Sequence, residues 1–148
     1  MEIKRILVPV DFSDYSEKAL NWAATIAEQW SSQVYLCHII PQPSYPSMIG
    51  GDDLAKFETG LQSAAETQLQ DLVSKLQNKN VQATIRISLG EPFNDICRIA
   101  EEERIDLIVM GTHGRTGLKH ALLGSVAERV VRYAPCPVLV VGKEASSQ

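Results

Sequence analysis

The sequence is poor in cysteine, and this shortage excludes two classes of small protein. Three cysteines in 148 residues are too few and too widely spaced for a disulfide scaffold or a cysteine-based zinc site. We interpret them as small core residues of a protein in a reducing compartment. They are Cys37, Cys97 and Cys136.

Histidines and long apolar runs are scarce as well. The three histidines, His38, His113 and His120, lack zinc-ligand spacing, so no structural metal site is expected. No apolar stretch approaches the ~20 residues that span a bilayer, and Asp11 ends the apolar stretch near the start. We therefore expect no signal peptide, no transmembrane helix and a cytoplasmic location.

The chain also lacks the basic excess of a polyanion-binding protein. Lysine and arginine number 14 against 18 acidic residues, which gives a formal net charge of −4. DNA or RNA is therefore not expected as the main partner.

Both standard phosphate-binding fingerprints are missing, but a different glycine pattern is present. Thr116 stands where G-x-x-x-x-G-K-[ST] needs its second glycine, and the segment has no G-x-G. It does contain Gly111-Thr112-His113-Gly114 and, nine residues later, Gly124-Ser125. Glycines let the main chain approach a ligand, and a helix start offers unpaired N–H groups at the positive end of its dipole. The pattern indicates a phosphate-binding loop, with turn glycines and a helix cap as the alternative.

Apolar patterning alternates between strand and helix along the chain. Strands are expected at 3–10, 33–40, 81–88, 105–110 and 138–141, with helices between them at 14–30, 54–78, 93–100 and 124–133. Ser13 is expected to cap the first helix, whose apolar positions are Ala19, Trp22, Ala23, Ile26, Ala27 and Trp30. Segment 41–53, rich in proline and glycine, is expected to be a loop. Strict alternation over 81–88 predicts a half-exposed edge strand. These patterns predict a single-domain α/β fold with an open parallel sheet.

Three motifs together resemble the universal stress protein family. They are ILVPVDFS at 6–13, Gly111-x2-Gly114-x9-Gly124-Ser125, and PCPVLVV at 135–141. The resemblance covers essentially the whole chain and is weakest over 41–53. It implies five parallel strands in the order 3-2-1-4-5 with helices on both faces. Residues 1–143 would form the domain and 144–148 a polar tail.

The resemblance also implies a ligand. The family divides into members that keep the glycine motif and bind ATP and members that have lost it, and this chain keeps it. ATP is therefore expected, with Mg²⁺ or Mn²⁺ on the triphosphate. The expected contacts are Pro9, Val10, Asp11, Ile39, Met110, Gly111, Gly114, Arg115, Gly124, Ser125 and Val126.

These contacts lie where ligands bind in open α/β sheets. In the implied strand order, the order in which strands are added to the sheet reverses between the first and fourth strands. The carboxyl ends of these two neighbouring strands flank the point of reversal. Val10, Ile39 and Met110 would form apolar walls for adenine, with ordinary core as the alternative. Asp11 would accept ribose hydroxyl hydrogen bonds or help hold a metal, or it would simply cap the first helix. Ser125 would both cap the last helix and meet a phosphate oxygen.

Charge is uneven around the expected phosphate site. Arg115 and Lys119 lie inside the loop and are candidates for touching an anion. Arg129 and Arg132 lie on the following helix and are interpreted as a solvated face.

The favoured function is a regulatory or stress-response module in which ATP is a ligand that orders the glycine loop. A slow ATPase or phosphoryl-transfer enzyme is the alternative, although no P-loop lysine, kinase catalytic-loop motif or placed base is visible. A flavodoxin-like electron carrier would need a phosphate loop after the first strand, where this chain has Asp11-Phe12-Ser13-Asp14.

A homodimer is expected through the last strand, Val138–Val141. Its apolar residues suit antiparallel pairing of two identical edges across a two-fold axis. The alternative is that helices on both faces of the sheet make this strand apolar.

Overall fold

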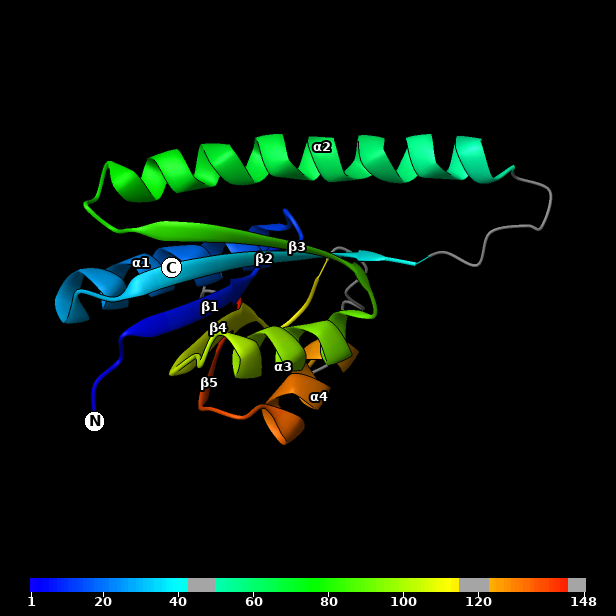
Figure 1. Ribbon diagram of the computed structural model, residues 1–148. Helices are drawn as coiled ribbons and strands as arrows, with labels where there is room; N and C mark the ends of the chain where they lie inside the picture. Colours follow the sequence, from blue (N-terminus) through cyan, green and yellow to red (C-terminus); the bar gives the residue numbers. More distant parts are fainter. Residues whose placement is uncertain (43–49, 115–122, 144–148) are drawn as a thin grey trace.

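The computed structural model describes residues 1–42, 50–114 and 123–143, and strands alternate with helices along it (Figure 1). The elements are β1 (Arg5–Pro9), α1 (Asp14–Trp30), β2 (Gln33–Pro41), α2 (Gly51–Gln77), β3 (Ala83–Gly90), α3 (Pro92–Glu102), β4 (Leu107–Gly111), α4 (Ser125–Tyr133) and β5 (Val138–Val141). The strands form one parallel sheet with the order β3-β2-β1-β4-β5. This confirms the predicted α/β fold and its strand order.

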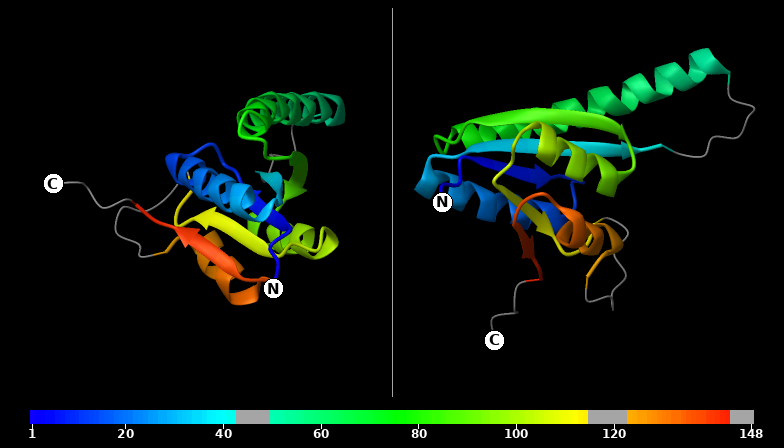
Figure 2. Two further views of the ribbon diagram at one scale, coloured as in Figure 1. Left: turned by 90° about the vertical axis from the view of Figure 1, so that its left-hand side faces the viewer. Right: turned by 60° about the horizontal axis from the view of Figure 1, so that its bottom comes forward.

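Helices cover both faces of the sheet, and each face has its own apolar core (Figure 2). On one face, Ile6 and Val8 of β1 pack with α1 and with Leu69 of α2, forming what we call the first core. On the other face, Leu7 packs with Ile99 of α3 and with α4, forming the second core. Neighbouring β1 residues thus point to opposite faces, and β1 is apolar on both because it lies in the middle of a parallel sheet.

Helix α1 begins where the sequence predicts. The hydroxyl oxygen of Ser13 accepts a hydrogen bond from the Ser16 N–H at 3.3 Å and caps the helix. Two of the predicted apolar positions, however, do not reach the core: Trp22 and Trp30 are 54% and 49% exposed. The buried side of α1 is mostly alanine, and the two indoles lie outside this narrow buried face.

Helix α2 is buried over its second half only. It begins at Gly51, three residues earlier than predicted, and its first half projects beyond the sheet (Figure 1). Phe57 and Leu61 in this first half are 53% and 36% exposed, whereas Leu69 and Val73 lie in the first core. The predicted loop at 41–53 overlaps residues 43–49, which lie outside the described residues.

Strand β3 is an edge of the sheet, as predicted, and starts two residues later than expected. All eight of its residues are half-buried, because α2 covers one face and α3 the other. Ile85 and Ile87 pack against the first core. The alternate residues Arg86 and Ser88 reach side chains of α3 instead. The polar side of β3 is therefore covered by a polar network rather than by solvent.

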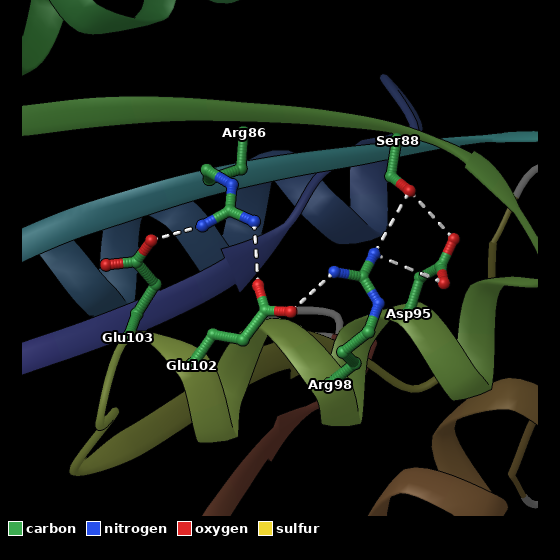
Figure 3. A network of polar contacts seen from close by, with 6 residues as sticks. All are labelled: Arg86, Ser88, Asp95, Arg98, Glu102 and Glu103. Carbon is green, nitrogen blue, oxygen red and sulfur yellow. Dashed lines mark hydrogen bonds and ion pairs between the residues drawn. The ribbon is translucent and has the colours of Figure 1, made fainter.

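This network ties α3 to the edge of the sheet (Figure 3). Arg86 forms ion pairs with Glu103 and, at 3.0 Å, with Glu102. Glu102 also pairs with Arg98 at 2.9 Å, and Arg98 lies 3.4 Å from Asp95. Hydrogen bonds from Arg98 and then Arg86 hold the pKa of the Glu102 carboxyl below its ordinary value.

The cysteines are free thiols. Cys37 is fully buried in β2, and desolvation raises the pKa of its thiol to about 12. Cys136 is half-buried against the second core, and desolvation raises its thiol pKa to about 11.

Within the described residues, none of the helices is both long and apolar enough to cross a membrane.

Candidate functional site

The central strands β1 and β4 lead to helices on opposite faces of the sheet. They pair through Ile6–Leu107 and Leu7–Ile108. β1 ends at Pro9 and continues into α1, whereas β4 ends at Gly111 and precedes α4. We call the residues that follow these two strands, together with the start of α4, the switch point. It is the place where open α/β sheets bind ligands.

The turn from β1 into α1 is held by its own side chains. The carboxylate of Asp11 accepts hydrogen bonds from the N–H of Ser13, at 3.0 Å, and from the Ser13 hydroxyl. Ser13 in turn caps α1. Asp11 therefore supports the helix cap that Ser13 provides, and its contact with a nucleotide stays a prediction.

Gly111 and Gly114 bring the segment after β4 close to the β1–α1 turn. A Cβ on Gly111 would lie 2.6 Å from the Cβ of Tyr15, and a Cβ on Gly114 would collide with the Asp11 carboxylate. Neither described glycine has a positive φ, so close approach, not a left-handed backbone, is what requires glycine here. The fold itself therefore requires glycine at position 111, where the neighbour is the Cβ and main chain of Tyr15, whereas at position 114 the neighbour is the movable end of the Asp11 side chain.

Helix α4 begins with an N-terminus that no side chain at the cap position covers. Gly124 is the N-cap residue, with φ −65° and ψ 155°, and Ser125 is the first helical residue. The prediction that Ser125 caps this helix was therefore wrong by one position. The first intrahelical bond runs from the Glu128 N–H to the Gly124 carbonyl at 2.9 Å. The N–H groups of Ser125, Val126 and Ala127 precede that bond, and glycine offers them no acceptor.

The contrast with α1 decides which helix can receive an anion. Ser13 occupies the N-cap of α1 with an acceptor of the protein's own, and Asp11 adds a negative charge beside it. α4 has neither at its cap, and Glu128, the acidic residue of its first turn, is paired with Arg132 at 3.0 Å. The N–H groups and dipole of α4 are thus the better anion site at the switch point.

Thr112 attaches the start of α4 to the end of β4. Its carbonyl accepts a 2.7 Å hydrogen bond from the Gly124 N–H, and its own N–H donates to the Val141 carbonyl at 3.0 Å. The neighbouring His113 ring lies 5.4 Å from the Tyr15 ring, centre to centre. The two glycine-containing parts of the motif therefore meet through the main chain.

The three expected adenine walls do not lie together. Val10, Ile39 and Met110 are 5%, 8% and 5% exposed. Ile39 and Met110 belong to the second core, whereas Val10 belongs to the first. The structure brings Ile39 and Met110 to one face of the sheet and puts Val10 on the other.

The main chain of β2 offers polar groups at the same place. The N–H of Val10 donates to the Cys37 carbonyl at 2.7 Å, so the peptide groups of Cys37 face β1. Peptide groups alternate along a strand, so those of Ile39 face the same way. Because β1 ends at Pro9, the peptide groups of Ile39 point past the end of β1.

The basic residues of the expected phosphate site divide into two groups. Arg115 and Lys119 lie outside the described residues. Arg129 and Arg132 are exposed, as predicted, and both are ion-paired. Arg129 lies 2.7 Å from Glu91 and its guanidinium is 4.1 Å from the centre of the Phe93 ring, which ties α4 to α3.

In the described part of the chain, the side chains do not form a metal site that would work in the absence of a bound nucleotide. No cluster of three histidine, cysteine, aspartate or glutamate residues occurs there.

Two surface hollows lie at the opposite end of the sheet, where Gln33, Asn80 and Gln82 line both. Their lining includes none of the switch-point residues, and the switch point is recognised by its hydrogen-bonding groups.

Sequence reasoning missed three residues of the switch point: Phe12, Tyr15 and His38. Tyr15 fills the space beside Gly111, and His38 contacts both Val10 and Phe12. The contacts of all three residues depend on which strands are neighbours, which the residues themselves do not reveal. The one local signal was the position of Tyr15 shortly after the first strand.

Known proteins share this fold. The Universal stress protein family model matches residues 2–142. Universal stress protein MJ0531 of Methanocaldococcus jannaschii is 36% identical over 140 residues, covering 95% of this chain and 82% of that protein. The solved structure of protein MJ0577, from the same organism, has a TM-score of 0.89 at 33% identity and covers 99% of this chain and 100% of its own.

A more distant structure holds a nucleotide. The universal stress protein from Archaeoglobus fulgidus in complex with dAMP has a TM-score of 0.65 at 26% identity, covering 95% of this chain and 98% of its own. The family model spans nearly all the residues that build the two cores and the switch point. This chain therefore belongs to the universal stress protein family.

Proposed function

We propose that this protein binds ATP at the switch point and uses it as a regulatory ligand. The observation that carries the proposal is the glycine-capped start of α4, which lies beside the end of β4 and offers the N–H groups of Ser125 and Val126. A triphosphate is the kind of anion that such a helix start accommodates.

The remaining residues suit the other parts of the nucleotide. The peptide groups of Ile39 and the side chain of Met110 would meet the adenine, and Asp11 would accept hydrogen bonds from ribose hydroxyls. Gly114 and Arg115 would complete the phosphate contacts. The carboxylate of Asp11 beside the phosphate site favours a bound Mg²⁺ or Mn²⁺, which would neutralise the triphosphate.

The comparison with the Archaeoglobus fulgidus protein supports an adenine nucleotide as the ligand. dAMP contains the adenine and one of the phosphates that ATP contains. Family membership and the retained glycine pattern then favour ATP over other phosphorylated ligands.

The proposal is tested by asking what the purified protein carries and binds. Acid extraction should release an adenine nucleotide, or calorimetric titration with Mg-ATP should show saturable binding that GTP does not reproduce. Absence of both would remove the nucleotide-binding proposal.

A slow ATPase is the alternative. The sequence has neither a P-loop lysine nor a kinase catalytic-loop motif. Steady-state turnover far below the ordinary range of about 1–10³ per second is therefore expected. Robust hydrolysis that depends on the α4 start would place the protein among enzymes instead.

We also propose a homodimer through β5. β5 is the open edge of the sheet opposite β3. The carbonyls of Pro137 and Val141 accept hydrogen bonds from β4 and the residue after it, so the peptide groups of Val138 and Val140 face outward. Two such edges can pair antiparallel about a two-fold axis.

A further inference from the structure

Phe12 has a backbone conformation that a phenylalanine rarely adopts. Its φ is 64°, in the left-handed region, although it has a bulky side chain. Such a conformation is unfavourable for a residue with a Cβ and persists only where the surroundings hold it. Phe12 directly follows Asp11, so whatever holds Phe12 helps to fix the backbone that carries the Asp11 carboxylate, which Ser13 holds by two hydrogen bonds.

His38 of β2 contacts the residues on both sides of Asp11. Its Nδ1 lies 2.6 Å from the carbonyl oxygen of Val10. Its ring centre lies 4.8 Å from that of Phe12, with the two planes tilted by 42°. A carbonyl can only accept, so the histidine must carry a proton on Nδ1. One side chain thus fixes the turn before and after Asp11.

We propose that His38 is a positioning residue, which holds the Val10–Phe12 turn and thereby aims the Asp11 carboxylate at Gly114 and the ribose. The part that concerns the nucleotide rests on the proposed function. The part that concerns the turn does not, because it follows from the contacts of His38 alone.

The proton on Nδ1 provides a test that needs no nucleotide. Long-range ¹H–¹⁵N correlation spectra of the wild-type protein should show His38 protonated at Nδ1, whereas free neutral imidazole favours the other nitrogen. A bare Nδ1 would overturn the proposal, because the hydrogen bond to Val10 could not exist.

Variants separate positioning from simple packing. His38→Leu removes the donor, whereas His38→Asn keeps an N–H near the position of Nδ1. His38→Leu should weaken ATP about tenfold, the loss of roughly one hydrogen bond, and His38→Asn should restore most of it. Equal affinity in His38→Leu and the wild type would overturn the proposal.

A double-mutant cycle with Asp11 shows whether the effect passes through that carboxylate. In an Asp11→Ala background, His38→Leu should cause no further loss of ATP affinity. The same loss in both backgrounds would mean that His38 acts on packing alone, which contradicts the proposal. If the wild type binds no ATP, the proposed function fails, and the spectra still decide whether His38 holds the turn.

Discussion

The main-chain N–H of Gly124 meets the carbonyl of Thr112 at 2.7 Å, and a Cβ on Gly124 would lie 2.8 Å from the same oxygen. This contact joins the start of α4 to the end of β4. It also means that Gly124 is required by the protein's own main chain. A side chain there should therefore disturb the fold as well as any ligand.

Gly124→Ala should lower the free energy of unfolding by about 1–3 kcal/mol, because the methyl group and the Thr112 carbonyl cannot both keep their positions. Gly50 provides a matched control. It is the N-cap of α2 with nearly the same φ and ψ, and a Cβ there meets nothing within 4 Å. Denaturant unfolding of both variants gives the comparison. An equal cost at the two positions would refute the steric argument.

Asp11→Ala should weaken ATP by about 1.5–3 kcal/mol, the scale of a hydrogen bond to a charged group. It should also reduce the discrimination between ATP and 2′-deoxy-ATP. Ser13→Ala is the control, because it removes the α1 cap and keeps the carboxylate. Should Ser13→Ala change the ribose preference as much as Asp11→Ala does, Asp11 would act only through the cap.

Val140→Pro should convert a dimer into a monomer without unfolding it. Proline removes the outward N–H of the open edge, and edge strands tolerate it there. Leu139 is a poor site for this test, because its side chain packs against the first core. Val140→Thr keeps the N–H and should stay dimeric in sedimentation experiments. A wild-type protein that is monomeric at tens of micromolar would contradict the dimer.

Acid should loosen the attachment of α3 to β3. The pKa of Glu102 is held below its ordinary value of 4.5, so the stabilisation is present above about pH 4.5 and is lost as the pH falls through the lower folded-state value. Glu102→Gln should therefore flatten the dependence of the melting temperature on pH below 4.5. Glu101→Gln, on the same helix, is the control. An unchanged slope in Glu102→Gln would show that the ion pairs with Arg98 and Arg86 contribute nothing.

The sequence predicted the fold well, because each strand and helix carries its own pattern. The apolar run of β1, the alternation in β3 and the Ser13 cap are all local signals. The exposure of Trp22 and Trp30 was not predictable from spacing, because it depends on how closely an alanine-rich helix approaches the sheet. The same holds for the half-buried β3, whose polar side chains meet partners from a helix that follows later in the chain.

The site was predicted as a set of residues but not as an arrangement. The glycine spacing indicated where the chain must come close, but it could not show that Tyr15 and Asp11 are the neighbours. Assigning Val10 and Met110 to opposite faces requires the strand register. The residue type of Phe12 does not indicate that its φ is left-handed.

The central claim is that the N–H groups at the start of α4 bind the triphosphate, and Ser125 allows the most direct measurement. Proline is favoured at the first helical position, and Gly124 already has the extended ψ that a following proline requires. Ser125→Pro should therefore fold while it lacks both the N–H and the hydroxyl. Ser125→Ala lacks only the hydroxyl. Titrated with Mg-ATP, Ser125→Pro should bind about tenfold or more weakly than Ser125→Ala, with equal melting temperatures of the free proteins. Equal ATP affinity of the two variants would contradict the account.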